Sequence, residues 1–600
     1  MSPVTEMLLL VLLNCLFTQC IADIPVHCLI EEVIGIWRVK MTEPVKTSEE
    51  FACGHELPDN FMTVLQNGDS YETPIFEKSH KYQTFEHDIH LISESEGLAT
   101  ICILSGPRKG CVNGTWTMVY DEAIIVKSPD YDLLMFLQYE IKPEFRNRHI
   151  TSMENLDYFN SLCTLSFSGW WSEGGTKDKG CAIGRNISPV EKAKIHSSEM
   201  RMEGEKSTFM VSPSSLLQLQ SRDRVRHRHR SGNRMSLVNA ASEDSEIKTF
   251  LDEEWKVDIG LINYINSNNF GWTAHKDSAK TFAGMSRREV FKMGGRHRYH
   301  YNNADKGTTL EKVDVSHEVS ITLNQMKDET TKKNELKRRQ CIEEKMPKQF
   351  TWQGAQGFDK DIMTPVVDQG SCGSCYAEAS VDAATIRYRI AHYNSHESES
   401  RSVVFSVDEV LNCAPQNQGC DGGYPDIVGF YAKHIGLITK DCSPNFSSND
   451  DNKKECKTDC KRYYAHDFDY VSGSAWKVSV ADMMKDIIEN GPIAVAVDAT
   501  DELFVYQSGV FNAVIEDSDV IVSSTHKSFW EKTTHAVMIV GWDEISWIVK
   551  NSWGPSWGDN GYFRLKRGVN EIAVEALPTA IYFTESKRPA NKNAPDVSEC

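Results

Sequence analysis

The sequence predicts an α+β protein made of several units. Its 600 residues exceed the size of one domain. Residues 23–188 contain short runs rich in β-branched and aromatic residues between turn residues, which is typical of antiparallel strands. After residue 347, a helical pattern is followed by apolar strands. We therefore expect an N-terminal β-barrel, a helical middle section and a mixed α+β domain.

Residues 1–22 are predicted to be a signal peptide. The apolar run at 7–13 is about one hydrophobic region long and too short to span a bilayer, and Cys20-Ile21-Ala22 supplies a cleavage site. No Lys or Arg precedes the run, and a buried N-terminal helix is the alternative. No other stretch is long enough to cross a membrane. We expect the secretory pathway, with a lysosome-like or vacuolar compartment or the exterior as destination.

Charge and cysteine usage narrow the function classes. The formal net charge of −20 argues against nucleic acid, because binding phosphates needs a basic face. An oxidising route makes the 17 cysteines disulfide candidates first, and removing Cys15 and Cys20 with the leader leaves an odd number. The N-x-S/T triplets at Asn113, Asn186 and Asn445 are candidate glycosylation sites.

Residues 23–188 are expected to form the barrel, closed by its own disulfides. The clearest strands are at 116–120, 123–126 and 133–137. Residues 189–346 differ, with basic runs at 222–230 and 337–339 that we expect to be exposed and open to proteases. Between these runs, residues 250–270 have helical apolar spacing at Trp255, Ile259, Ile262 and Ile265. This pattern favours a removable pro-segment, and a permanent interdomain helix is the alternative.

Residues 347–585 hold a candidate catalytic set. Cys375 lies where a glycine-containing turn enters a helix, whose N-terminus should lower the thiol pKa toward thiolate. His535 can act as its base, and Asn551 can hold the imidazole in the useful tautomer, with Trp553 covering that hydrogen bond. Gln369 can point its amide at a developing oxyanion. Each residue alone has a structural explanation, but the four in this order are specific.

Cys372 and Cys375 form a C-x-x-C pair, so a redox motif or half a zinc site must be considered. No second pair with zinc-ligand spacing follows, and the segment 455–460 reads as a disulfide loop. We expect no metal and no required cofactor.

The segments Gln-Gly-Ser-Cys-Gly-Ser-Cys-Tyr at 369–376 and Lys-Asn-Ser-Trp-Gly-Pro-Ser-Trp-Gly at 550–558 resemble the nucleophile and asparagine signatures of the papain family. Further matches are Asp-Ile-Pro-Val-His-Cys at 23–28, Gly-Ile-Trp at 35–37, the glycine segment at 419–425 and propeptide motifs at 262–296. Together these resemble the cathepsin C (dipeptidyl peptidase I) family over nearly the whole mature chain. The resemblance implies a two-lobed papain-like peptidase domain, with a helical lobe and a β-barrel-like lobe, preceded by an antiparallel β-barrel exclusion domain.

The resemblance also implies site residues. Asp23 would bind the substrate ammonium group, and Gly422, Gly423, Tyr424 and Pro425 would line the substrate site. Implied disulfides are Cys28–Cys163, Cys53–Cys181, Cys372–Cys420, Cys413–Cys456 and Cys442–Cys460. We add Cys102–Cys111 as a local pair, which leaves Cys341, Cys375 and Cys600 unpaired. A homotetramer is also implied.

Some residues depart from the family pattern. The family binds chloride partly through a tyrosine at the position of Asp426, and an acid there would repel an anion, so chloride binding is doubtful although Tyr470 matches the other chloride tyrosine. Glu378 replaces an aromatic or small residue on the nucleophile helix, and residues 516–532 are an insertion expected to be an exposed loop. The tail at 586–600 is polar and expected to be loose.

The leading hypothesis is a cysteine-type dipeptidyl aminopeptidase, acting on peptides and proteins with free N-termini through a Cys–His thiolate acyl-enzyme mechanism. A papain-like endopeptidase is the alternative, and a catalytically inactive binding module is a third. The first two hypotheses differ in whether the substrate needs a free α-amino group. The third differs from both because its catalytic residues would not support a reaction.

Overall fold

The computed structural model describes much of the chain. The described residues are 28, 30–45, 52–53, 84–92, 98–103, 110–142 without 121, 159–188 without 174–177, 249–294 without 250–251, 329–393 without 359–361, 401–443, 456, 459–473, 478–513, 533–584 and 590–600. The predicted signal peptide, Asp23, Asn445, the basic run at 222–230 and the insertion at 516–532 lie outside them.

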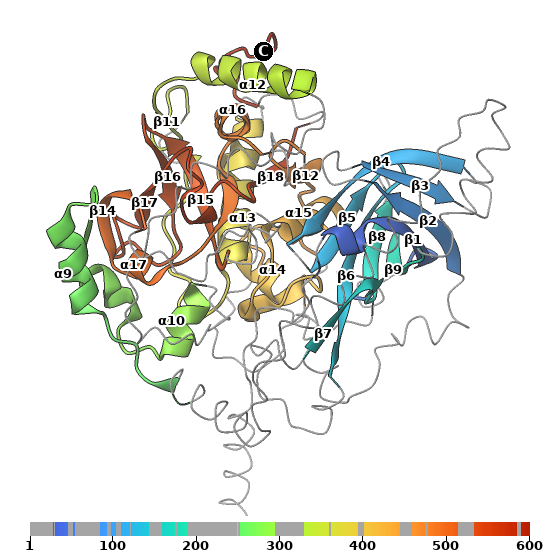
Figure 1. Ribbon diagram of the computed structural model, residues 1–600, viewed down its shortest axis with the longest axis horizontal. Coiled ribbons are helices and arrows are strands. Elements are labelled where there is room, and N and C mark those ends of the chain that lie inside the picture. Colours follow the sequence, from blue (N-terminus) through green and yellow to red (C-terminus); the bar gives the residue numbers. More distant parts are fainter. Residues whose placement is uncertain are drawn as a thin grey trace, which may run out of the picture.

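The N-terminal unit is a closed antiparallel barrel (Figure 1). Closure comes from β1, which pairs with β2 on one side and β9 on the other, so that Trp37 is opposite both Ile89 and Asn186. Large apolar side chains such as Trp37, Trp170 and Phe136 fill the interior. The short helix α2 (Ile30–Val33) precedes strands β1 (Gly35–Thr42), β2 (Thr84–Leu91), β3 (Leu98–Ile103), β4 (Gly110–Val119), β5 (Ala123–Lys127), β6 (Tyr131–Ile141), β7 (Phe159–Ser166), β8 (Gly169–Glu173) and β9 (Lys179–Asn186).

Three disulfides stabilise this barrel. Cys102 and Cys111 are directly opposite each other on β3 and β4, which is why this local pair can form. The other two bonds tie segments outside the strands to the barrel, and they are Cys28–Cys163 and Cys53–Cys181.

The described part of the middle section is helical with one short strand. Its elements are α9 (Ile259–Asn268), β10 (Trp272–Ala274), the 3-10 turn η3 (Ser278–Phe282), α10 (Arg287–Met293) and α12 (Glu329–Lys345). The expected helix over 250–270 is shorter than predicted, because Asp258 caps its N-terminus and Trp255 lies before it. Ile262 and Ile265 are buried as the apolar spacing predicted, whereas Ile259 is exposed.

The last unit has the two lobes of the expected fold. The helical lobe contains α13 (Cys375–Ala391), α14 (Val407–Cys413), η7 (Gly419–Asp421) and α15 (Pro425–His434). The sheet lobe contains β11 (Phe350–Thr351), β12 (Asp467–Tyr470), α16 (Val480–Asn490), β13 (Ile493–Val497), α17 (Asp501–Phe504), β14 (Tyr506–Phe511), β15 (His535–Trp542), β16 (Ser546–Lys550), β17 (Tyr562–Lys566), η10 (Glu571–Ala573) and β18 (Thr579–Tyr582). Every residue of β15 is buried, and α13 packs against β15 and β18, which brings the start of α13 beside the start of β15.

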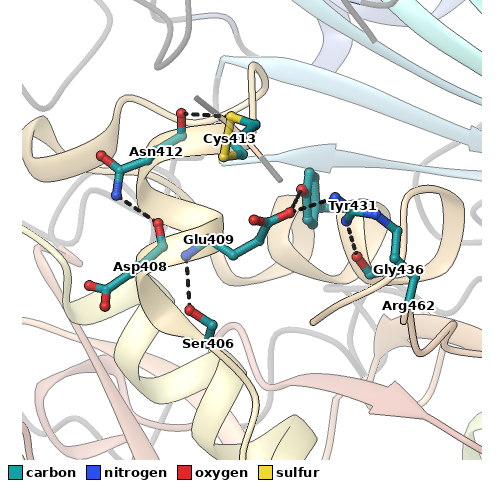
Figure 2. Close-up of a disulfide and its surroundings, with 9 residues drawn as sticks. Ser406, Asp408, Glu409, Asn412, Cys413, Tyr431, Gly436 and Arg462 are labelled. Carbon is teal, nitrogen blue, oxygen red and sulfur yellow. Dashed lines mark hydrogen bonds and ion pairs between the residues drawn. A yellow bond between two sulfur atoms is a disulfide. The ribbon is translucent and has the colours of Figure 1, made fainter. Parts of the chain in front are cut away.

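The helical lobe has a buried polar brace (Figure 2). Ser406 caps α14 by accepting a hydrogen bond from the Glu409 amide at 3.1 Å. The buried Glu409 carboxylate accepts bonds from the Tyr431 hydroxyl and the Arg462 guanidinium, both at 2.8 Å. Cys413, which ends α14, is bonded to Cys456, and Cys442 is bonded to Cys460. These contacts fix α14 against α15 on either side of the glycine segment 419–425.

Three expectations about the middle section and the tail are wrong. The basic run at 337–339 is part of α12 and not an open linker, because Arg338 and Arg339 form ion pairs with Glu335 one turn away. Residues 590–600 are attached rather than loose, because Asn591 and Val597 are buried and the Asn591 amide donates to the Glu489 carbonyl. Cys341 and Cys600, expected to be unpaired, form a disulfide across 259 residues. Among the described helices, none is long and apolar enough to span a membrane.

Candidate active site

Cys375 is the first residue of α13 and is only 7% exposed. The turn before it is anchored to η7 by the Cys372–Cys420 disulfide and by a hydrogen bond from the Gly373 amide to the Cys420 carbonyl at 2.8 Å. A Cβ on Gly373 would lie 2.7 Å from that carbonyl, so only glycine fits. The tether therefore fixes the direction in which the thiol enters the site.

The thiol pKa differs from the expectation of a lowered value. Burial raises the pKa of Cys375 to about 11, outweighing the backbone N–H groups of Ala536, Tyr376 and Cys375, which lower it. The negative charge of nearby Glu378 raises it further. The helix N-terminus is in place as predicted, but desolvation dominates while the site is covered.

His535 is the first residue of β15 and lies beside the nucleophile through the backbone of Ala536. Its Nε2 is 2.8 Å from Oδ1 of Asn551, which follows β16, so the ring proton is on Nε2 and Nδ1 is left as the acceptor. The Trp553 ring stacks on the imidazole with centroids 4.7 Å apart, as expected for a cover over this bond. Within the described part of the chain, Nδ1 has no hydrogen-bond partner.

Burial lowers the pKa of His535 to about 4, although the bond to Asn551 opposes this change. Because the thiol pKa is raised and the imidazole pKa is lowered, both groups are neutral over most of the pH range in this state. A thiolate–imidazolium pair needs a wetter site or nearby donors. Burial in this state therefore opposes the thiolate–imidazolium pair that the reaction needs.

Gln369 is held so that its amide nitrogen faces the nucleophile turn. Its Oε1 accepts a hydrogen bond from the Ser552 hydroxyl at 2.6 Å, which fixes the orientation of the amide. Its Nε2 donates to the Cys372 carbonyl at 2.9 Å and more weakly to the Met293 carbonyl at 3.4 Å. An oxyanion in the place of the Met293 oxygen would receive the same donor.

Residues 282–293 of the middle section contact this site. Met293, the last residue of α10, places its carbonyl on Nε2 of Gln369 and, at 3.1 Å, on Nε1 of Trp553. Next to it, Lys292 forms an ion pair with Asp421 of η7 at 2.9 Å. Phe282 of η3 contacts the Trp553 ring edge-on at 5.4 Å. Helix α10 is therefore docked on the oxyanion donor, the glycine segment and the cover of the catalytic histidine.

The predicted substrate residues lie between the nucleophile and the barrel. Gly423 has φ +157, and a Cβ there would lie 2.4 Å from Oδ1 of Asn417. Tyr424 and Pro425 are buried at the start of α15, and the Tyr424 hydroxyl donates to the Glu122 carboxylate of the barrel. Asp426 is also buried, and its carboxylate accepts a bond from the Tyr470 hydroxyl at 3.1 Å.

The two predicted glycosylation sites that the structure describes differ in exposure and hydrogen bonding. The Asn113 side chain is on an exposed part of β4, whereas Nδ2 of Asn186 donates to the carbonyls of Val33 and Ile34. A glycan on Asn186 would have to displace at least one of those bonds. The described residues include no cluster of His, Cys, Asp or Glu that could hold a metal.

Sequence reasoning did not identify the residues that cover the site. Lys292 and Met293 act through an ion pair and a main-chain carbonyl, and the propeptide motif that begins at Met293 indicated neither contact. The available signal was the capping box of α10, in which Ser286 and Glu289 bond each other's backbone amides. That Ser-x-x-Glu pattern locates the helix but not its target.

A thiol, an imidazole oriented by an amide and a glutamine donor define a cysteine peptidase site. Residues 346–581 match the papain family of cysteine proteases, and the chain belongs to this family. Its N-terminal barrel, residues 23–186, matches the cathepsin C exclusion domain.

Known relatives agree with this assignment. Cathepsin C of Schistosoma mansoni is 34% identical over 39% of this chain and 50% of its own length. Cathepsin B-like CP2 of Giardia intestinalis is 32% identical over 37% of this chain and 70% of its own. Tubulointerstitial nephritis antigen of Bos taurus is 25% identical over 59% of this chain and 73% of its own. The chain thus spans half the length of the cathepsin C relative.

Proposed function

We propose that this cysteine peptidase is a dipeptidyl aminopeptidase, which releases dipeptides from the free N-termini of peptides and proteins. A papain-type groove is open at both ends, so dipeptide release needs a block beyond the second substrate residue. The observation that supports such a block is the contact of the barrel's β4–β5 turn with the active site.

Tyr120 and Glu122 of that turn reach the residues around the nucleophile. The Tyr120 ring lies 5.1 Å from the Tyr424 ring, and Glu122 accepts the Tyr424 hydroxyl bond. Thr533, which precedes His535 by two residues, hydrogen-bonds the Tyr120 side chain, and burial raises the Tyr120 pKa well above its usual value, with a further rise from Asp426. Tyr120 has φ 52, in a left-handed conformation that is unfavourable for a tyrosine. Such strain is typical of a turn held in place by its contacts.

Ion pairs support a fixed barrel. Asp132 on β6 contacts Lys433 at 2.6 Å and His434 at 3.0 Å at the end of α15. Burial alone would raise the pKa of Asp132, but the bond from His434 and the charge of Lys433 together lower it. The carboxylate therefore stays ionised, and its ion pair with Lys433 persists, in a mildly acidic compartment.

Asp23 would supply the ammonium-binding carboxylate in this proposal. Signal cleavage after Ala22 would make it the N-terminus, and the disulfide at Cys28 ties that terminus to the barrel. A charge-assisted bond to the substrate ammonium would contribute about 1.5–3 kcal/mol. Its position lies outside the described residues, so this role comes from the sequence.

The proposed chemistry uses the four predicted residues. Once α10 has left, Nδ1 of His535 takes the Cys375 proton, and the thiolate attacks the carbonyl carbon of the second substrate residue. Gln369 and the Cys375 amide stabilise the oxyanion, and the imidazolium protonates the leaving amine. Water then hydrolyses the thioester and frees the dipeptide, with His535 as base.

Product analysis distinguishes this proposal from endopeptidase activity. Processed enzyme is incubated with an unmodified peptide of about ten residues, and the products are followed by mass spectrometry. Successive losses of two residues from the N-terminus are expected. Early internal fragments would favour the endopeptidase. An unchanged peptide would favour an inactive binding module, and the likeness to tubulointerstitial nephritis antigen is the reason to test for that outcome.

The proposal extends to location and assembly. Seven disulfides and a matching cathepsin C relative support a secretory route, and we propose a lysosome-like or vacuolar compartment, or secretion. We also propose the homotetramer implied by the cathepsin C resemblance. Light scattering of the processed enzyme tests it, and a monomer mass would contradict it.

A further inference from the structure

The described middle section has two parts that lie at different ends of the peptidase domain. Figure 1 shows α10 near α13 and α14, and α12 at the opposite end beside the C-terminus. Of these two helices, α10 contacts Gln369 and Trp553 through the Met293 carbonyl and η7 through the Lys292–Asp421 pair. Helix α12 packs against α16 instead. Uncovering the active site therefore requires α10 to leave and places no such demand on α12.

Helix α12 is bonded covalently to the end of the chain. Cys341 in its last turns forms the disulfide with Cys600. Residues 346–581 match the papain family, so this bond joins two segments that flank the matched domain on either side. Cleavage of the main chain on either side of α12 would leave the helix attached.

Charged contacts hold the same helix in place. The Arg338 guanidinium donates to both carboxylate oxygens of Asp482 on α16, at 2.9 and 3.0 Å, and also pairs with Glu335. The Arg339 side chain is 8% exposed and pairs with Glu335 at 2.8 Å. A protease needs an extended and accessible chain, so these two arginines are poor cleavage points.

Apolar burial and the tail complete the attachment. Ile342 and Met346 are buried, and the adjacent Pro347 carbonyl accepts a bond from the Trp542 indole at 3.0 Å. Lys345 donates to the Asp596 carbonyl at 3.0 Å, and Val597 is buried close by. The tail itself is held to the end of α16, where the Asn591 amides bond the carbonyls of Ile488 and Glu489.

We propose that α12 is a permanent, disulfide-anchored part of the mature peptidase and is not discarded with the inhibitory segment. The cut that frees α10 then falls N-terminal to Glu329. The two parts of the middle section therefore differ in this proposal. The first part must leave the active site, and the last part stays bonded to the C-terminal residues. This inference holds whether the enzyme acts on chain ends or within chains.

Peptide mapping of the processed enzyme tests the proposal. Active protein from the full chain is treated with iodoacetamide without reduction, digested and analysed by mass spectrometry. The expected result is a linked peptide pair containing Cys341 and Cys600, in an amount equal to that of a peptide from the catalytic domain. A mature enzyme with no peptide from 329–346 and with alkylated Cys600 would overturn the proposal.

Limited proteolysis gives a second measurement. Cys600→Ser removes the disulfide and keeps the charged and apolar contacts of α12, so the fold should survive, and trypsin should then cut after Arg338 or Arg339 at least tenfold faster than in the wild type. The control Cys102→Ser/Cys111→Ser removes a barrel disulfide and should leave this rate unchanged. Rapid cutting at 338–339 in the wild type, with release of α12, would contradict the proposal.

Discussion

The main-chain carbonyl of Met293 accepts a hydrogen bond from Nε2 of Gln369, the side chain expected to stabilise the reaction's oxyanion. The same carbonyl accepts a bond from Trp553, whose ring covers the catalytic His535. One carbonyl of the middle section thus contacts both the expected oxyanion donor and the ring that stacks on His535. Burial raises the pKa of the Cys375 thiol to about 11 and lowers that of the His535 imidazole to about 4, so both shifts favour the neutral groups.

Weakening the attachment of α10 should expose the thiol. Lys292→Ala removes the ion pair to Asp421, which joins a nearly buried side chain to a partly exposed one. Loss of such a pair weakens docking by about 1 kcal/mol, or roughly fivefold. We expect a several-fold faster reaction of Cys375 with iodoacetamide in the unprocessed protein. Lys280→Ala, an exposed lysine of the same segment, is the control, and equal rates in the two variants would refute the docking role.

Cys375→Ala should abolish peptidase activity without loss of the fold. The change removes the thiol at the first position of α13, and loss of a member of a catalytic set reduces the rate by orders of magnitude. Alanine suits a helix start packed against β15, so the melting temperature should change by only a few degrees. The measurement compares kcat/KM and thermal unfolding with the wild type. Appreciable turnover by the pure variant would show that another nucleophile is used.

Glu378→Gln should change both stability and thiol reactivity at alkaline pH. Glu378 lines a cavity of about 10 Å³ with Asn551, Asp382 and Lys550, which is space for roughly one water. The Glu378 residue as a whole is half-buried. Burial of its carboxyl group raises the pKa of that group to about 8. Asp382 on α13 and Asp408 on α14 raise it further, while Lys550 on β16 and Lys440 lower it.

The raised pKa of Glu378 determines the direction in which the stability of the folded protein changes with pH. Between about pH 4.5 and 8 the folded protein holds a proton that the unfolded chain has lost, so Glu378 makes stability fall as pH rises. The Glu378→Gln variant, which is neutral at this position, should therefore gain melting temperature over the wild type at pH 8 and differ little at pH 4. Its thiol should also be alkylated faster above pH 8, because the Glu378 charge no longer opposes the thiolate. Glu544→Gln, at an exposed carboxylate, is the control, and the same pH trend there would contradict the assignment.

Activity should not depend on chloride. The chloride tyrosine implied by resemblance is replaced by Asp426, whose buried carboxylate already bonds the Tyr470 hydroxyl. Burial raises the pKa of Asp426 to about 7, so a mildly acidic medium keeps it largely neutral, and the hydroxyl is occupied in either state. Exchanging chloride for acetate should alter kcat/KM by less than about twofold. A drop of tenfold or more would show that an anion is bound after all.

The sequence predicted the fold class and proposed a candidate catalytic set that the structure brings together, because both depend on local patterns. Cys375, His535 and Asn551 are in short motifs, and their elements have clear apolar signatures, such as β15, which is buried along its whole length. The barrel could be predicted from strand patterns, although its closure by β1 and β9 is a pairing of distant segments.

Features that depend on distant contacts escaped prediction. Cys341 and Cys600 are far apart in the chain, and one was assigned to a discarded segment and the other to a loose tail. The Met293 carbonyl is a main-chain atom, so its role at Gln369 leaves no mark in the sequence. The thiol pKa was expected to fall with the helix N-terminus, but burial of the thiol reverses the balance.

The central claim is that the enzyme requires a free substrate α-amino group, and one pair of assays tests it directly. The processed wild type is given a dipeptide-amide reporter and the N-acetylated form of the same reporter, and kcat/KM is measured for both. Loss of a charge-assisted bond of about 1.5–3 kcal/mol predicts a kcat/KM lower by one to two orders of magnitude for the acetylated form. Asp23→Asn should reduce turnover of the free reporter by a similar factor. Equal turnover of the two reporters by the wild type would contradict the account and favour an endopeptidase.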